Sequence, residues 1–108
     1  MRLTEEQKHI EKIIVKAFDG NIQIGTAAVL IDPHIDGKPS ALVESVEVIE
    51  NRRRQGIGKM LMLYLIELAN DRDCYKLVLQ CVNHNVPFYK ACGFHVHQNG
   101  MRRNLYEE

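Results

Sequence analysis

A glycine-rich turn lies in the middle of the sequence and reads Arg53-Arg54-Gln55-Gly56-Ile57-Gly58-Lys59. Closely spaced glycines allow backbone N–H groups to point toward one bound anion, and a helix that starts there adds partial positive charge. Arg53, Arg54 and Lys59 bring full positive charges to the same place. The spacing differs from the Gly-x-Gly-x-x-Gly dinucleotide fingerprint and from the P-loop. The turn therefore predicts either a pyrophosphate site or a structural turn whose arginines face solvent.

The segments on both sides of this turn predict a strand before it and a helix after it. Leu42–Ile49 alternates as a strand, which is expected to place Leu42, Val46 and Val48 on one face. Ile57–Asp71 is expected to be a helix, because apolar residues recur in it at three- and four-residue spacing.

The sequence before Leu42 predicts a hairpin, a loop and a short leading helix. Lys12–Phe18 and Ile22–Ile31 are rich in β-branched residues and are separated by the turn Asp19-Gly20-Asn21, as in an antiparallel hairpin. Pro33–Ser40 holds two prolines and a glycine and is expected to be a loop. A capping box begins the chain and predicts one or two helical turns over Thr4–Ile10.

The sequence after Asp71 predicts a strand, a helix and a closing strand. Tyr75–Cys81 is almost continuously apolar, as a strand buried on both faces would be. Asn85–Cys92 is expected to be a short helix that stops at Gly93, and Phe94–Leu105 a closing strand or hairpin. The order (α)-β-β-β-α-β-α-β predicts one α/β (α+β) domain over residues 1–108, with a mixed, mostly antiparallel sheet and flanking helices.

Composition excludes several classes of function. The chain of 108 residues has 14 Lys and Arg against 14 Asp and Glu, so it lacks the basic excess of a general nucleic-acid binder. It has no apolar run long enough to cross a bilayer and begins with polar residues, which predicts a cytoplasmic protein without a membrane partner. The cysteines form no Cys-x-x-Cys pair and the histidines show no ligand spacing, so we expect no metal site and reduced thiols.

The glycine turn, with a strand before it and a helix after it, matches the Arg/Gln-x-x-Gly-x-Gly/Ala motif of the GNAT acetyltransferase superfamily. A second stretch runs from Cys74-Tyr75-Lys76 through Asn85-Val86-Pro87-Phe88-Tyr89 to Cys92-Gly93-Phe94. It resembles the glucosamine-6-phosphate N-acetyltransferase branch, and the likeness covers roughly residues 12–103. The resemblance implies an acetyl-CoA-dependent N-acetyltransferase that acts by direct attack of a glucosamine 6-phosphate amine in a ternary complex, in the route to UDP-N-acetylglucosamine.

The resemblance also implies where acetyl-CoA would lie. Its pyrophosphate would sit on the amides of Arg54–Lys59, and its pantetheine arm would pair like a strand with Val46–Val48. The full set of implied cofactor-binding residues is Val46, Glu47, Val48, Arg53, Arg54, Gln55, Gly56, Ile57, Gly58, Lys59, Gln80, Asn85 and Tyr89.

Three catalytic roles follow from the same resemblance. Glu44 would position the amine or take its proton, and the backbone N–H of Val46 would polarise the acetyl carbonyl. Tyr89 would protonate the departing thiolate, because a phenol of pKa about 10 is a reasonable acid for a thiolate of pKa about 8.5. Judged without the family, Glu44 would be a rim carboxylate and Tyr89 a core aromatic.

The implied acceptor site departs from the family in several places. Its residues would be Glu44, Ser45, Tyr75, Lys76, Gln80 and Arg103. Ser45 and Gln80 stand where the family has aspartates, and Asn104 stands where it has a basic residue, so Arg103 is the expected substitute.

The front of the chain departs from the family most. The family begins with a strand and two helices, of which only the helix predicted over Thr4–Ile10 would remain. Members of this branch are dimers, so we expect a homodimer in which the partner subunit completes the site. Two other functions stay open: acetylation of a different small amine, and a CoA-binding interaction module without turnover.

Overall fold

A four-stranded sheet organises the chain, in a computed structural model that describes residues 1–35 and 37–106. The strands follow the order β1-β2-β3-β4, so β1 is an edge strand. Their bounds are β1 Glu11–Asp19, β2 Ile22–Ile35, β3 Lys38–Val48 and β4 Leu77–Val78. The first three strands pair antiparallel and β4 joins β3 in parallel. The predicted class, a mixed and mostly antiparallel sheet with flanking helices, is confirmed.

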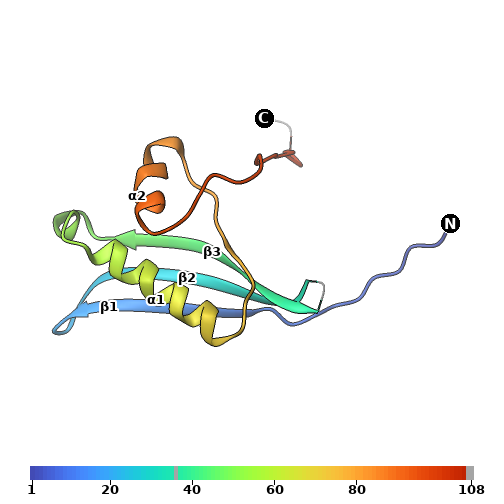
Figure 1. Ribbon diagram of the computed structural model, residues 1–108, viewed down its shortest axis with the longest axis horizontal. Helices are drawn as coiled ribbons and strands as arrows, with labels where there is room; N and C mark the ends of the chain where they lie inside the picture. The colour runs from blue at the N-terminus through green and yellow to red at the C-terminus, as the bar shows by residue number, and fades with distance from the viewer. Residues whose placement is uncertain (36, 107–108) are drawn as a thin grey trace.

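Two α-helices flank the sheet (Figure 1). α1, Ile57–Asp71, lies across one face of the sheet, and its bounds confirm the helix predicted from apolar spacing. α2, Val86–Ala91, lies beside the end of β3. Short 3₁₀ turns over Glu50–Arg52 and Asn83–Asn85 precede the two helices. No helix in the described part of the chain is long and apolar enough to span a membrane.

The core lies between α1 and the central strands β2 and β3. Met62 and Leu65 of α1 and Val29 of β2 are the largest side chains that are fully buried. Alternate β2 residues face α1 because successive side chains of a strand point to opposite faces. The buried cluster consists of Ala27, Val29, Ile31, Ala41, Val43, Leu61, Met62, Leu65 and Ala69.

The loop predicted over Pro33–Ser40 is wrong, because the β2–β3 hairpin continues into it. β2 extends to Ile35, β3 begins at Lys38, and these two residues pair. The pairing register shifts between Asp32 and Ile35, and Pro33 lies inside this irregularity. Proline has no N–H to give to a ladder, so it is tolerated at such a place. Asp36 lies outside the described residues.

A β-bulge in β3 overturns the predicted division of its faces. Val43 pairs with Val29 and Ser45 with Ala28, so Glu44 between them has no partner on β2. One extra residue reverses the alternation, and Val43 therefore packs toward α1 together with Val46 and Val48. Leu42 was expected to share that face, but its side chain points the other way and is 41% exposed.

Both terminal predictions are wrong. Residues 1–10 and 94–106 contain no helix or strand, and the N-terminal segment extends away from the body of the domain (Figure 1). Helices of one or two turns are marginal in water unless an apolar face packs against something. All of residues 1–10 are exposed, so the predicted helix has nothing to pack on.

Candidate active site

The parallel strands β3 and β4 separate almost as soon as they pair. Their register contains only Ala41↔Leu77 and Leu42↔Val78. The strand predicted over Tyr75–Cys81 is therefore too long, and it is not buried on both faces, since Val78 is 37% exposed. Beyond these pairs this edge of β3 has no strand partner in the described part of the chain. We call the region beside the unpaired edge the opening, and it is where the resemblance expects acetyl-CoA.

Backbone groups of β3 point into this opening. The N–H of Ile49 donates to the carbonyl oxygen of Ile24 at 3.0 Å, so the backbone groups of Ile49 point toward β2. Neighbouring residues of a strand point their backbone groups to opposite edges. The backbone groups of Val46 and Val48 therefore point away from β2. Consistent with this, the carbonyl oxygen of Val48 accepts a hydrogen bond from Nε of Arg53 at 3.0 Å.

The glycine turn begins α1 with an uncapped N-terminus. Gly56 is the N-cap residue with φ 83°, Arg54 has φ 64°, and no side chain caps the helix. The first N–H groups of an α-helix have no partner within the helix. Those of Ile57, Gly58 and Lys59 are therefore available to an anion at the end of β3.

The basic side chains of the turn differ in their engagement. Arg52 Nη1 forms an ion pair with Asp19 Oδ2 at 2.7 Å and fastens the turn to β1. Arg53 bonds the backbone as described above. Within the described chain, Arg54 and Lys59 are exposed and form no ion pair, so they remain as cations for a ligand.

α2 places two aromatic side chains beside the start of α1. Its observed bounds confirm the predicted helix to within one residue at each end, with Asn85 as N-cap. The ring of Phe88 lies against Gly58. The Tyr89 ring meets those of Phe88 and Phe94 edge to face, with centroid distances of 5.0 and 6.0 Å. Burial raises the pKa of the Tyr89 phenol, which keeps its proton in place at neutral pH.

Glu44 has a partner that sequence reasoning missed. Lys12 Nζ lies 2.6 Å from Glu44 Oε1, and the two residues are 32 positions apart. No local pattern links such residues, because the contact depends on β1 and β3 lying on either side of β2.

The other predicted acceptor residues do not form one cluster. The N–H of Tyr75 donates to the carbonyl oxygen of Pro39, and the N–H of Ala41 donates to the carbonyl oxygen of Lys76, each at 3.0 Å. These pairings place Lys76 and Tyr75 opposite Ser40 and Pro39, so they lie roughly 13 and 17 Å along β3 from Glu44 at the strand rise per residue. Lys76 Nζ lies 5.3 Å from the centre of the Tyr75 ring.

Gln80 lies beside the C-terminal segment that carries Arg103. A Cβ atom on Gly100 would be 3.6 Å from Gln80 Nε2, so the C-terminal segment passes close to Gln80. Arg103 is exposed on that segment, and no ion pair in the described chain engages it.

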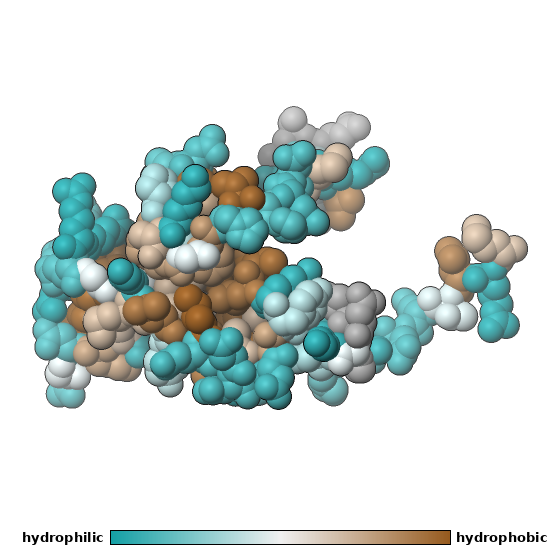
Figure 2. Space-filling model, viewed as in Figure 1, coloured by the Kyte–Doolittle hydropathy of each residue, from teal (hydrophilic) through white to brown (hydrophobic). Residues whose placement is uncertain are grey.

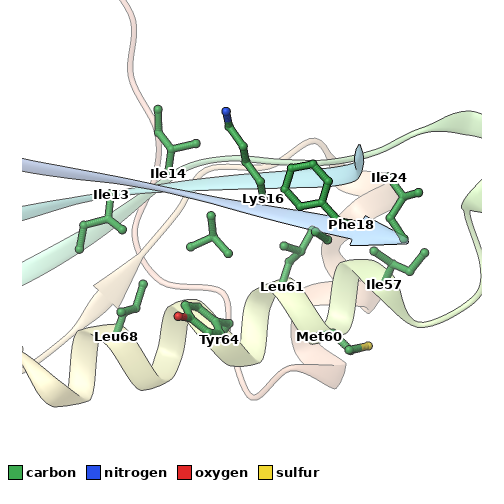
Figure 3. Close-up of a pocket in the computed structure, with 12 residues that line it drawn as sticks. Ile13, Ile14, Lys16, Phe18, Ile24, Ile57, Met60, Leu61, Tyr64 and Leu68 are labelled. Atoms are coloured by element: carbon green, nitrogen blue, oxygen red, sulfur yellow. The ribbon is translucent and has the colours of Figure 1, made fainter. Parts of the chain in front are cut away.

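A hollow lies between β1 and α1, away from the opening, and no sequence pattern predicted it. It has a volume of about 510 Å³ and is mostly apolar (Figure 3). Ile13 points into it toward α1, whereas Ile14 and Lys16 point to the other side of the sheet. Apolar side chains also gather at the surface in the middle of the face that carries α1 (Figure 2).

The three cysteines are free thiols. Cys74, Cys81 and Cys92 form no disulfide. Burial raises the thiol pKa of Cys74 and of Cys92, although nearby Lys59 partly offsets this for Cys92. Among the described residues, no three His, Cys, Asp or Glu side chains lie together as a metal site would need.

The opening, the uncapped helix and the aromatic helix agree with a comparison to known families. Residues 2–94 match the Acetyltransferase (GNAT) family. The chain belongs to this family. The glucosamine 6-phosphate N-acetyltransferase of Trypanosoma brucei brucei is 33% identical over 76% of this chain and 57% of its own length. That of Schizosaccharomyces pombe is 36% identical over 75% of each chain. The chain thus spans little more than half of the first relative.

Solved structures show the same architecture. An acetyltransferase from Trypanosoma brucei superposes with a TM-score of 0.78 at 30% identity, covering 89% of this chain and 69% of that one. The glucosamine-6-phosphate N-acetyltransferase of Arabidopsis thaliana gives a TM-score of 0.79 over 88% of this chain and 67% of its own. Its identity is 22%, so it supports the fold alone.

Proposed function

We propose that the chain transfers the acetyl group of acetyl-CoA to the amine of glucosamine 6-phosphate. The observation that carries this proposal is the open edge of β3 at Val46 and Val48, next to the uncapped start of α1. Relatives named glucosamine 6-phosphate N-acetyltransferase support the choice of acceptor. The product would be N-acetylglucosamine 6-phosphate, a precursor for UDP-N-acetylglucosamine.

Acetyl-CoA fits the donors that the opening offers. Its pyrophosphate would accept hydrogen bonds from the N–H groups of the first turn of α1, with Arg54 and Lys59 adding charge. Its pantetheine arm would lie along Val46–Val48, because an extended chain with amide groups can pair with an unpaired strand edge. Asn85 is the N-cap residue of α2 and would contact the cofactor from there.

The reaction would proceed by direct attack. The amine nitrogen forms a bond to the thioester carbonyl carbon, and the N–H of Val46 would stabilise the oxyanion that develops. Glu44 would take the proton that the amine loses, directly or through a water molecule. The carbon–sulfur bond then breaks, and Tyr89 would give its proton to the departing thiolate and regain one from solvent.

The raised pKa of Tyr89 supports this role, because the phenol holds its proton until the thiolate forms. Ser45, next to Glu44 in β3, and Gln80, two residues after β4, would contact the sugar. Tyr75, Lys76 and Arg103 would contact the acceptor from the side of β4 and the C-terminal segment. For Arg103 this would require the exposed C-terminal segment to be ordered by the acceptor or by a second subunit.

A homodimer belongs to this proposal. The sheet face opposite α1 exposes apolar side chains that a monomer would leave in water, among them Ile14, Phe18 and Leu42. Light scattering after size exclusion should give twice the mass of 12.4 kDa. A single-chain mass at every concentration would contradict this part of the proposal.

Release of the CoA thiol with acetyl-CoA and a panel of amines tests the reaction. We expect glucosamine 6-phosphate to be the best acceptor. Turnover with another amine only would show that the acceptor is different, a result that Ser45 in place of the family's aspartate makes worth testing. Binding of acetyl-CoA without turnover on any amine would identify a CoA-binding module.

A further inference from the structure

Lys12 and Glu44 form an ion pair that spans the width of one strand. Lys12 lies on β1 and pairs with Leu30 of β2, which in turn pairs with Leu42 of β3. The ammonium reaches across this row to Glu44 Oε1 at 2.6 Å. Glu44 is the bulged residue of β3, so its position there depends on the extra residue in the strand.

This ion pair lies on the open face of the sheet. Ile13, next to Lys12, packs toward α1, so the side chain of Lys12 points to the opposite face. α1 covers only the first of these faces (Figure 1). The side chains of Lys12 and Glu44 are 46% and 42% exposed. In the single chain a ligand can therefore approach both charges, and in the proposed homodimer the partner subunit would form a wall of the same acceptor site.

We propose that Lys12 selects acceptors that carry an anionic group. When such an acceptor binds, the ion pair between Lys12 and Glu44 breaks. The acceptor's ammonium then pairs with the Glu44 carboxylate, and its phosphate pairs with the Lys12 ammonium. This inference rests on the proposed function, in which Glu44 receives the amine. It gives Lys12 a role in specificity that neither a motif nor local spacing assigns.

The physical reason for selectivity is the balance of charges. An amine without an anion would displace Lys12 from Glu44 and leave the ammonium unpaired. An acceptor that has both charges replaces the one ion pair with two. Half-exposed ion pairs contribute little to stability, so the exchange meets little resistance. The new contact between the ammonium and the phosphate is a charge-assisted hydrogen bond.

Lys16 offers a matched control on the same strand. Its side chain points away from α1, as Figure 3 shows, and thus lies on the same face as Lys12. Four residues of strand put it about 13 Å from Lys12. Within the described chain Lys16 forms no ion pair, so Lys16→Met removes the same charge from the same face at another place.

The experiment measures binding and turnover for glucosamine 6-phosphate and for glucosamine. Calorimetric titrations in the presence of CoA give the dissociation constants, and thiol release gives kcat and KM. We expect Lys12→Met to weaken binding of the phosphorylated sugar by about tenfold or more. Binding of glucosamine should change by less than about twofold. Lys12→Arg should retain most of the affinity, and Lys16→Met should match the unmodified chain for both sugars.

The outcomes separate the inference from the proposed function. An equal loss for both sugars in Lys12→Met, or an equal loss in Lys16→Met, would overturn the inference, as would failure of the unmodified chain to bind the phosphorylated sugar. Selective loss of binding, in a chain that transfers acetyl to neither sugar, would uphold the role of Lys12 and refute the proposed reaction. A melting curve for each variant shows that it is folded.

Discussion

Phe88 lies so close over Gly58 that a Cβ atom on the glycine would be 3.3 Å from Cζ of the ring. The same Cβ atom would lie 3.8 Å from Cγ2 of Val48. Gly58 is thus the point where α1, α2 and β3 meet. Its missing side chain sets how near α2, and with it Tyr89, can come to the opening.

Gly58→Ala should disturb the site more than the fold. The added methyl group pushes Phe88 outward, and α2 with it. Alanine is favoured over glycine in a helix by about 1 kcal/mol, so the free energy of unfolding should change by less than about that amount. We expect a higher KM for acetyl-CoA at nearly constant Tm. Adding Phe88→Leu should make room and recover part of the loss, and a KM that stays unchanged in Gly58→Ala would contradict this account.

Gly56→Ala should destabilise the domain through the backbone alone. Gly56 has φ 83°, and no atom lies within 4 Å of the place where a Cβ would be. A left-handed conformation costs a residue with a Cβ roughly 1–2 kcal/mol. Urea denaturation should show a loss of that size. Gly56→Asn should lose less because asparagine tolerates this region, and equal losses in the two variants would argue against the explanation.

Tyr89→Phe should lower kcat without unfolding the chain. The substitution removes the proposed proton donor and keeps the ring contacts with Phe88 and Phe94. General acid catalysis typically contributes about 100-fold or more, so a loss of that order is expected in kcat. KM for acetyl-CoA should change little. A variant with undiminished kcat would remove Tyr89 from the mechanism.

The raised pKa of Tyr89 predicts an alkaline change in stability. Below pH about 10 the phenol is neutral in the folded and the unfolded chain alike. Above that pH the unfolded chain loses this proton first, so the stability of the unmodified protein falls until the pH passes the raised pKa of the folded state. Tyr89→Phe lacks this contribution. Its Tm relative to the unmodified chain should therefore rise above pH 10, and a constant difference would show that the phenol is not shifted.

Stability should depend on the core and little on the ion pairs. Leu65 is fully buried, and Leu65→Ala should cost about 2–5 kcal/mol. Arg52 and Arg72 join the two ends of β1 through Asp19 and Glu11, but these pairs are partly exposed. Arg52→Ala and Arg72→Ala should each cost less than about 1 kcal/mol in chemical denaturation. Larger losses would mean that the edge strand depends on its ion pairs.

The elements that follow from local rules were predictable. The glycine turn and α1 were predictable because helix periodicity and a glycine at a turn depend on residues that are neighbours in the sequence. The β1–β2 hairpin was found for the same reason, since two strand-like runs flank one tight turn. The family motif lies in this predictable part, and the anion site that we propose rests on the same residues.

Elements that depend on what packs against them were not predictable. The helix expected over Thr4–Ile10 does not form, because the tertiary structure gives it no surface to pack on. The strand after Tyr75 shortens to Leu77–Val78 because β3 diverges from it. Both segments carry local patterns that are compatible with the expected structure, but neither has a packing partner that would stabilise it.

The sequence by itself determined the glycine turn, the helix after it and the family motif, since each depends on residues a few positions apart. Only the tertiary structure decided which charges meet. Lys12 meets the Glu44 carboxylate because β3 bulges at Glu44 and β1 lies on the other side of β2. The edge of β3 at Val46 has no partner on β4 because the two strands separate after Leu42 and Val78. Contacts between strands are set by register and curvature of the whole sheet, which no short pattern contains.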